Sequence, residues 1–344
     1  MRVMNAITAA ALVAGSAFAA CGGAQAEGPL NIRVGWVVIS ADMAPLVFQK
    51  PDILKYYGTS YTVEPMHFAG TSLQITALAA SELDIASLAY SSLPLAVENA
   101  HLDDIRVVAD GFQDGHEGFA SIPYMVSNGG GIRTIEDLKG KALAVNAIGT
   151  AVDIGGRAVL SQHGLLYPRD YSIIEAPFPA LGAMLLEDKA AVASLASPFN
   201  QAPNVKQGAH TLFTMKDGMG TSQMIVMTAR KGFLEQHRAA LDDFFYDLVR
   251  GIHWMLDPAH RDAAIQFVAK VSAQPPSQFA SYYLTAEDQY HDPNGRPDLE
   301  AMQRNIDAEV KFGFLPRGIE VKKYADLSFI ERAAKRYGSE KTAK

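Results

Sequence analysis

A short pattern occurs twice in this chain, about a hundred residues apart. Residues 77–92 have the sequence ALAASELDIASLAYSS, and residues 183–199 have AMLLEDKAAVASLASPF. Each copy combines the end of an amphipathic helix, a charged turn, a small apolar strand containing Ala-Ser-Leu-Ala, and a polar turn. A Gly-containing turn precedes each copy, FAGTS at 68–72 and PALGA at 179–183. The repeat predicts two similar α/β lobes, and a cleft between two lobes is a common place for a small ligand.

Length and composition agree with two globular lobes. The chain has 344 residues, which is more than one ordinary hydrophobic core requires. Its 49% hydrophobic and 19% charged residues exclude a disordered chain. The formal net charge of −7 argues against nucleic acid or an anionic membrane as the main partner. A small anionic ligand stays open, because a local site can be positive on an acidic protein.

The first 26 residues are expected to be a signal peptide. Arg2 precedes an apolar, Ala-rich stretch, and residues 24–26 (Ala-Gln-Ala) have the small-x-small pattern of a signal-peptidase site. We therefore expect export to the periplasm. Residues 18–21 (FAAC) resemble a lipoprotein box, so lipidation of Cys21 is the alternative. Cys21 is the only cysteine, and cleavage after residue 26 removes disulfides, cysteine metal ligands and thiol catalysis together.

Strand and helix patterns alternate along the rest of the chain. Strands are expected near residues 31–38, 61–67, 84–89, 105–110, 142–147, 172–176, 210–214 and 222–230, besides the repeated helix and strand at 183–196. Helices are expected near residues 42–49, 51–58, 71–81, 134–140, 150–163, 233–256, 259–271 and 297–311. This alternation predicts an α/β protein with largely parallel sheets covered on both faces.

The order of these elements divides the chain into lobes. Residues 27–121 are expected to form the first part of lobe 1, and residues 122–222 are expected to form lobe 2. Residues 223–344 then return to lobe 1 and add C-terminal helices. Two crossing strands, around 119–127 and 222–230, are expected to connect the lobes.

Several stretches resemble a known family. They are LNIRVGWVV, FAGTSLQITALAASELDIASL, TIEDLKGKALAVNAIGT and MIVMTARK. The chain resembles periplasmic substrate-binding proteins of ABC transporters, of the nitrate/sulfonate/taurine type. The resemblance implies a type II periplasmic-binding-protein fold, with two crossing strands, a hinged closure on the ligand and a membrane permease as partner. We also expect a monomer without a cofactor or metal.

Two other functions are compatible with this fold. A pyrimidine-synthesising enzyme of thiamine biosynthesis shares it, but depends on a cysteine-rich segment that this chain lacks. A ligand-sensing domain of a membrane receptor is the second alternative. The sequence has no GxxxxGK[ST], GxSxG or HExxH motif, and its nine histidines show no metal-ligand spacing. We therefore predict a binding protein and not an enzyme.

Three turns that follow strands are expected to bind the ligand. The first-turn N–H groups of a helix lack partners and carry partial positive charge, so they accept an anion. Small residues allow close approach, and hydroxyls add donors. Helix capping is the alternative role for the hydroxyl residues. Asp153 and Arg157 fit an i, i+4 ion pair. The predicted anion-binding turns contain Ser40, Ala41 and Asp42; Gly70, Thr71 and Ser72; and Gly149, Thr150 and Ala151.

Tyr90 and Phe199 come just after the two copies of the repeated strand. We expect both rings to face the cleft and to stack on an apolar or aromatic ligand body. His116, in a Gly-flanked loop, and Thr221, before the second crossing, are further candidates; solvent exposure is the alternative for His116. The predicted ligand is a sulfonate or carboxylate, with an aromatic body as the variant that Tyr90 and Phe199 suggest.

Overall fold

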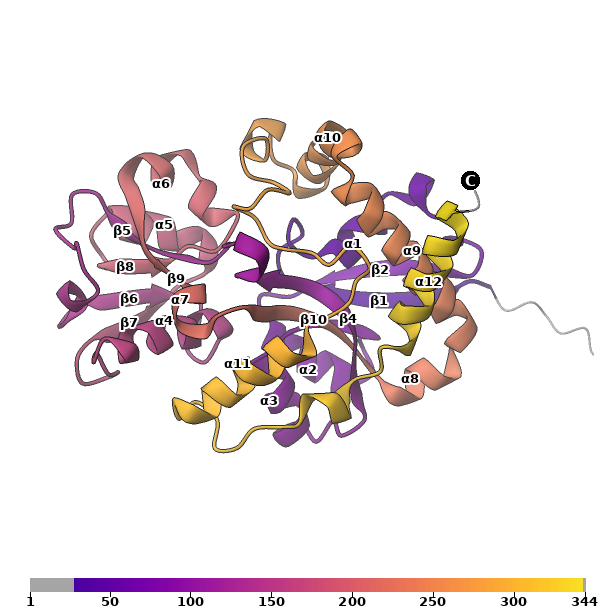
Figure 1. Cartoon of the computed structure of the whole chain (residues 1–344), viewed down its shortest axis with the longest axis horizontal. Coiled ribbons are helices and arrows are strands. Elements are labelled where there is room, and N and C mark those ends of the chain that lie inside the picture. Colours follow the sequence, from indigo (N-terminus) through magenta and orange to yellow (C-terminus); the bar gives the residue numbers. More distant parts are fainter. Residues whose placement is uncertain (1–27, 343–344) are drawn as a thin grey trace, which may run out of the picture.

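The computed structural model describes residues 28–342, so the predicted signal peptide and Cys21 lie outside it. Two five-stranded sheets lie toward opposite ends of the molecule's long axis (Figure 1). The helices of the chain's C-terminal part lie with the first sheet, together with the chain's C-terminus. This confirms the predicted α/β architecture of two lobes with C-terminal helices.

The sheet of lobe 1 contains three parallel strands followed by an antiparallel pair. β2 and β3 both run parallel to β1, which lies between them, whereas β10 runs antiparallel to β3 and to β4. In spatial order its strands are β2 (Tyr61–His67), β1 (Leu30–Trp36), β3 (Ile85–Ala89), β10 (Ser222–Arg230) and β4 (Ile105–Asp114).

The sheet of lobe 2 repeats this arrangement. β7 and β8 run parallel to β6, and β5 runs antiparallel to β8 and to β9. Its order is β7 (Ser172–Glu175), β6 (Ala142–Val145), β8 (Val192–Ser194), β5 (Pro123–Ser127) and β9 (Ala209–Thr214). Each sheet is thus more mixed than expected. The antiparallel strand in each case, β10 or β5, is the one that enters from the other lobe.

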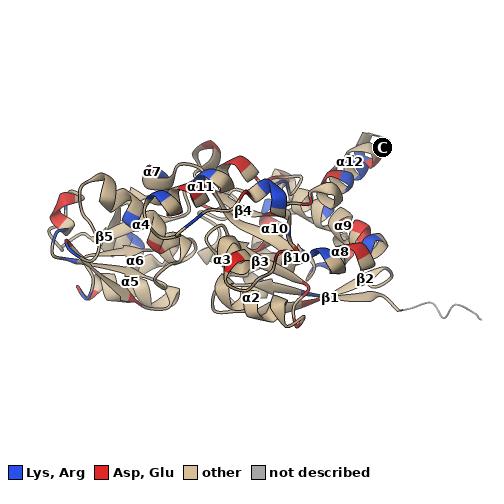
Figure 2. Cartoon of the chain, turned by 90° about the horizontal axis from the view of Figure 1, so that it is seen from below, with Lys and Arg blue, Asp and Glu red and all other residues tan. Residues whose placement is uncertain are grey.

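Helices cover both faces of each sheet, as the strand pattern predicts. Lobe 1 carries α1 (Met43–Val47), α2 (Thr71–Ala79), α3 (Ser92–Glu98), α8 (Lys231–Gln236), α9 (Arg238–Leu256), α10 (Arg261–Ser272), α11 (Leu299–Lys311) and α12 (Ser328–Thr342). Lobe 2 carries α4 (Ala151–Gln162), α5 (Phe178–Leu186), α6 (Pro203–Gly208) and α7 (Met215–Met219). Figure 2 shows acidic and basic residues together on α8, α9, α11 and α12. No helix within residues 28–342 has the length and apolarity needed to cross a bilayer.

Three helix predictions need correction, and several helices were missed. The expected helix at 51–58 is a 3-10 turn, Pro51–Ile53, because the next backbone N–H groups donate to the buried carboxylate of Asp247 instead of continuing a helix. The helix expected at 134–140 is likewise a 3-10 turn. The run at 233–256 is two helices, separated by the non-helical backbone of His237. The short helices α3, α6 and α7 and the C-terminal helix α12, whose buried face is small, were not predicted.

The chain passes between the lobes twice, from β4 to β5 and from β9 through α7 to β10. In the first link, the Asp114 carboxylate accepts from the Ser121 N–H at 2.6 Å and from its hydroxyl at 2.8 Å. In the second link, Asn305 of α11 donates to the Ser222 hydroxyl at 3.2 Å. The predicted lobe boundaries fall within the first link and at the end of the second.

A third segment contacts both lobes, although the chain does not pass from one lobe to the other through it. Residues 280–298, here called the interlobe segment, follow α10 and the 3-10 turn Pro276–Gln278, and run toward lobe 2 and back to α11 (Figure 1). Tyr290 pairs with Gln113 at the end of β4, while the Ala286 carbonyl accepts from the Ala120 N–H at 3.2 Å. Gln289 donates to the Ser197 carbonyl of lobe 2 at 3.2 Å. The described structure is therefore held together by contacts beyond its two links.

Candidate ligand pocket between the lobes

A pocket of about 330 Å³ lies between the two lobes. Its walls come from the carboxyl ends of β1, β7 and β8, where parallel α/β sheets commonly bind ligands. Lobe 1 contributes Val38, Ile39, Ser40, Ser272, Gln274, Gln278 and Phe279. Lobe 2 contributes Phe178, Pro179, Gly182, Ala183, Pro198, Phe199, Ala202, Asn204 and Val205.

The pocket is mainly apolar, and its polar groups are neutral. None of its lining residues carries a charge. Ser40 is 8% exposed, and the buried hydroxyl of Ser272 has no hydrogen-bond partner among the described residues. Both hydroxyls, with the side-chain amides of the lining, provide adjustable donors and acceptors. The pocket therefore has the composition of a small-molecule site, with an apolar wall and a few polar groups.

Two aromatic rings form one wall of the pocket. Phe178 begins α5, and Phe199 begins a short 3-10 turn after β8. Their ring centroids are 5.4 Å apart and their planes differ by 4°, which is an offset-stacked pair. Gly182, one turn along α5, lets that helix approach α6, because a Cβ there would lie 2.8 Å from Val205 Cγ2. Backbone packing thus fixes where the aromatic wall stands.

Of the predicted site residues, Ser40 and Phe199 line this pocket. Ala41, next in the same turn, is buried and donates its N–H to the Val38 carbonyl at 2.9 Å. Thr71 begins α2, where its hydroxyl lies 2.8 Å from the Ser92 hydroxyl. The other members of these turns, Gly70 and Ser72, lie at the start of α2 and outside the pocket lining.

The capping role does not explain the three predicted turns. The residues that precede α1 and α2 are Asp42 and Gly70, so neither Ser40 nor Thr71 occupies an N-cap position. Thr150 does occupy the N-cap of α4, but its hydroxyl is 2.8 Å from the Ala147 carbonyl and makes no cap bond. The hydroxyl groups therefore serve other contacts.

Carboxylates of the chain itself already accept from amide groups just before one of these turns and within another. Asp42 Oδ2 accepts from the Val37 and Val38 N–H groups at 3.0 and 3.2 Å, and burial raises the pKa of Asp42 to about 6. Asp153 Oδ2 accepts from the Gly149 N–H at 2.8 Å and also pairs with Arg157 at 2.8 Å. The predicted i, i+4 pair is present. An incoming anion would compete with these internal acceptors.

Tyr90 lies outside the pocket lining, on a closed side of the cleft. It is fully buried, and its hydroxyl donates to the carbonyl of Ala151, the predicted site residue at the start of α4, at 3.3 Å. The Tyr124 hydroxyl donates to the next carbonyl, of Val152. Gly156 leaves room for Tyr124, since a Cβ there would lie 2.7 Å from its ring. The two tyrosines thus bring lobe 1 and β5 against the beginning of α4.

Glu309 of α11 lies in the same buried region. It is fully buried, and neither carboxylate oxygen has a hydrogen-bond partner among the described residues. Burial raises the pKa of Glu309 to about 8. Burial is also the main cause that raises the pKa of Tyr90, and the Glu309 charge adds to it. This carboxyl group is therefore mainly protonated at neutral pH.

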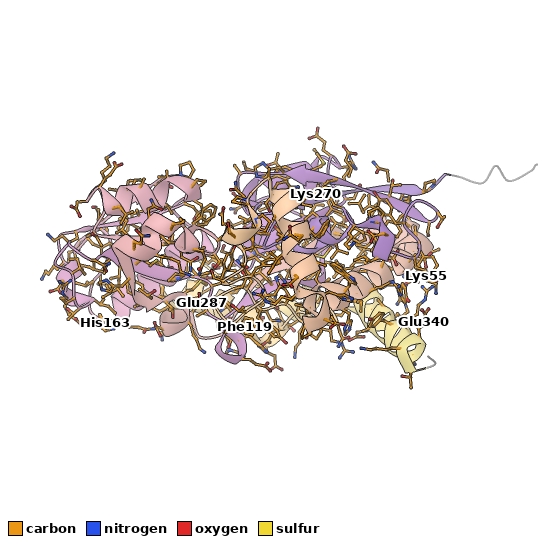
Figure 3. The ribbon with its side chains drawn as sticks, turned by 90° about the horizontal axis from the view of Figure 1, so that it is seen from above. Lys55, Phe119, His163, Lys270, Glu287 and Glu340 are labelled. Atoms are coloured by element: carbon orange, nitrogen blue, oxygen red, sulfur yellow. The ribbon has the colours of Figure 1, made fainter. Side chains whose placement is uncertain are left out.

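His116 and Thr221 lie at the links between the lobes. The His116 ring stacks on Tyr290 of the interlobe segment, with centroids 4.1 Å apart. The Thr221 hydroxyl lies 3.4 Å from the Gly115 carbonyl and so bridges the two links. Figure 3 shows Phe119 and Glu287 between the lobes, in this same region. Contact of His116 or Thr221 with a ligand stays a prediction, as it does for Tyr90, Gly149 and the other predicted residues outside the lining.

Several lining residues were not predicted. The beginning of α5 was visible in the repeat, since PALGA at 179–183 corresponds to the turn FAGTS that was chosen in lobe 1. No comparable signal marked the other unpredicted residues of lobe 1. Ser272 is the last residue of α10, and Gln278 and Phe279 lie at the end of the short 3-10 turn that follows. Among residues 28–342, no group of three His, Cys, Asp or Glu side chains is arranged to hold a metal ion.

The two mixed α/β sheets with a pocket between them define a periplasmic-binding-protein fold. Residues 25–269 match the NMT1-like family, and the chain belongs to this family. A search of curated protein sequences found no match. The resemblance inferred from the sequence is confirmed at the level of family and fold.

Solved structures share this fold at low sequence identity. The periplasmic nitrate-binding protein NrtA from Synechocystis has a TM-score of 0.73 and 13% identity, covering 90% of this chain and 89% of its own. The alkanesulfonate-binding protein SsuA from Xanthomonas axonopodis, bound to MOPS, has 0.69 and 16%, covering 87% and 99%. The desulfurization enzyme DSZB has 0.63 and 14%, covering 90% and 99%. The fold thus occurs in binding proteins and in an enzyme.

Proposed function

We propose that this protein is the extracytoplasmic solute-binding protein of an ABC importer. It captures a small organic anion, a sulfonate or a carboxylate, in the interlobe pocket and delivers it to a membrane permease. The observation that carries this proposal is a pocket whose walls come from both lobes, because closure of such lobes buries a ligand. The nitrate- and alkanesulfonate-binding proteins of the same fold support it.

The composition of the pocket supports binding rather than catalysis. Its lining contains no His, Asp, Glu, Lys or Cys side chain, so Ser40 and Ser272 have no general base within the lining to activate them. The same fold occurs in the desulfurization enzyme DSZB, so the fold alone does not decide between binding and catalysis. Neutral hydroxyl and amide donors suffice to hold a weakly basic anion.

Transport requires that the protein leave the cytoplasm. The leader pattern at 1–26 supports export to the periplasm, either as a cleaved soluble protein or as a lipoprotein through Cys21. We propose that the mature protein is a monomer, whose two lobe surfaces contact the permease once the cleft has closed. No further partner is required for ligand capture.

The experiment is a ligand screen of the mature protein. Sulfonates, aromatic carboxylates, nitrate and pyrimidines are tested by thermal shift, because a ligand that binds the folded state raises the melting temperature. Hits are then titrated by calorimetry. We expect at least one sulfonate or carboxylate to bind, and we expect Ala183→Trp, which places an indole in the pocket, to abolish binding.

The matched control is Ala239→Trp, at an exposed alanine of α9 outside the lining. It should bind the ligand as the unchanged protein does. The proposal is wrong if no sulfonate or carboxylate raises the melting temperature, or if Ala183→Trp binds as tightly as the control. A response to pyrimidines alone favours the thiamine-precursor alternative.

A further inference from the structure

We infer that the ligand carries a flat aromatic ring, which lies against the Phe178–Phe199 pair, and that the pocket selects this ring over an aliphatic body with the same acidic group. This inference rests on the proposed function, because it names the class of ligand that the interlobe pocket takes.

The rings of Phe178 and Phe199 are already stacked on each other. With centroids 5.4 Å apart and planes at 4°, Phe178 and Phe199 already contact each other, so no third ring fits between them. Both residues are only half-buried and both line the pocket. Their free ring surface therefore faces the cavity and can stack with one more ring.

The pocket wall opposite the aromatic pair is also apolar. Lobe 1 contributes Val38, Ile39 and the buried ring of Phe279 to the same cavity. A flat body on the aromatic pair would thus be covered by apolar side chains from the other lobe when the lobes close. Small-molecule pockets usually have volumes of about 300–1,000 Å³. The pocket of about 330 Å³ is at the lower end, which suits one ring with one substituent and is too large for nitrate alone.

The lining of the pocket carries no charged side chain. No lysine, arginine or histidine lines the pocket, and the Val37 and Val38 N–H groups beside it already donate to Asp42. The acidic group of the ligand consequently has only neutral donors, such as the Ser40 and Ser272 hydroxyls. Discrimination between ligands must then come mainly from the shape and π-surface of their bodies.

The test compares benzenesulfonate with cyclohexanesulfonate by calorimetry on the mature protein. The two molecules share the sulfonate and the ring size, and differ in flatness and π-surface. Benzoate and cyclohexanecarboxylate form a second pair, for the case of a carboxylate-specific pocket. We expect the aromatic member of at least one pair to bind about tenfold tighter, the range of an added stacking contact.

Phe199→Leu keeps an apolar side chain but removes the ring. With this variant, the affinities for the aromatic and aliphatic members of a pair should differ by no more than about twofold, mainly because the aromatic ligand binds more weakly. Phe178→Leu should act in the same direction, and it serves as the second variant if Phe199→Leu does not fold. Phe233→Leu, on α8 and outside the lining, should leave the preference unchanged.

Equal affinity for the aromatic and aliphatic members of each pair would overturn the inference and leave the proposed function intact. A preference that survives both Phe199→Leu and Phe178→Leu would also overturn it. If none of the four acids binds, the inference fails, whereas the proposed function is decided by the wider screen of sulfonates and carboxylates. If they bind but Ala183→Trp does not block them, the pocket itself is wrongly assigned.

Discussion

Tyr90 and Phe199 follow the two copies of one repeated strand, but they lie in opposite surroundings. Tyr90, directly after β3, is fully buried and donates to the Ala151 carbonyl of the other lobe. Phe199, three residues beyond the Ala-Ser-Leu-Ala of β8, is half-buried and lines the pocket. The segment that follows the repeated strand thus joins the lobes in one copy and lines the pocket in the other.

The difference shows that the two sides of the cleft have different structures: the lobes are packed together on one side and separated by a pocket on the other. On the Tyr90 side a continuous apolar core contains residues of both lobes, among them Leu88 and Val159. On the Phe199 side the lobes meet around an open cavity instead. We therefore expect stability to depend mainly on the first side and ligand binding on the second. Three substitution experiments examine this division.

The largest effect on stability is expected for Tyr90→Ala. It removes a fully buried ring from the apolar core, and truncation of such a side chain costs about 3–5 kcal/mol of unfolding free energy. Phe199→Ala removes a half-buried ring beside an existing cavity, so it should cost about 1 kcal/mol. Urea unfolding followed by circular dichroism measures both values.

Phe199→Ala should reduce the affinity for the ligand found in the screen more than Tyr90→Phe does. Tyr90→Phe retains the buried ring and loses only one hydrogen bond, which makes it the matched variant for the binding comparison. If Tyr90→Phe weakens the ligand more than Phe199→Ala does, the division between the two sides is wrong, and Tyr90 contacts the ligand as the sequence suggests.

The second prediction concerns Glu309, which lies on the closed side. Burial raises its pKa from 4.5 to about 8, so between these values the folded protein holds a proton that the unfolded chain releases. Stability therefore falls as pH rises through this range. At about 1.4 kcal/mol per pH unit, Glu309 alone should lower the free energy of unfolding by about 2–3 kcal/mol between pH 6 and pH 8.

Glu309→Gln replaces the carboxyl group with a neutral group of similar shape, and it should remove this part of the pH dependence. Urea unfolding at pH 6 and pH 8 gives the comparison. Glu300→Gln changes an exposed carboxylate of the same helix and serves as the control. A pH dependence that is identical in the unchanged protein and in Glu309→Gln would show that Glu309 is not protonated in the folded state.

The large features of the fold were predictable because they follow from local periodicity. The repeat indicated that β3 and β8 are equivalent strands, and the structure places each at the centre of its five-stranded sheet. The antiparallel entry of β5 and β10 was not predicted, because strand direction depends on where the chain returns. Likewise, the 3-10 turn at Pro51–Ile53 depends on Asp247, a contact almost 200 residues away in sequence.

The candidate site was predicted in part for a similar reason. Composition identified turns that can bind an anion, and Ser40 and Phe199 do line the pocket. It did not indicate that Asp42 accepts from amide groups just before its turn, or that Asp153 accepts from the Gly149 N–H, since those bonds depend on exact side-chain direction. Nor did it identify Phe279, because no periodic pattern marks the irregular segment that brings this ring to the cleft.

The smallest expected effect separates two serines at equivalent positions of the repeat. Ser87 of β3 and Ser194 of β8 are both buried, but the Ser87 hydroxyl donates to the Gly35 carbonyl at 2.9 Å, whereas the Ser194 hydroxyl has no partner among the described residues. Ser87→Ala should cost about 1 kcal/mol, the usual net value of one hydrogen bond. Ser194→Ala should change the free energy of unfolding by less than about 0.5 kcal/mol or raise it, because it removes an unpaired polar group from the core. Urea unfolding of both variants measures the difference, and equal costs would mean that the two copies of the strand share one environment after all.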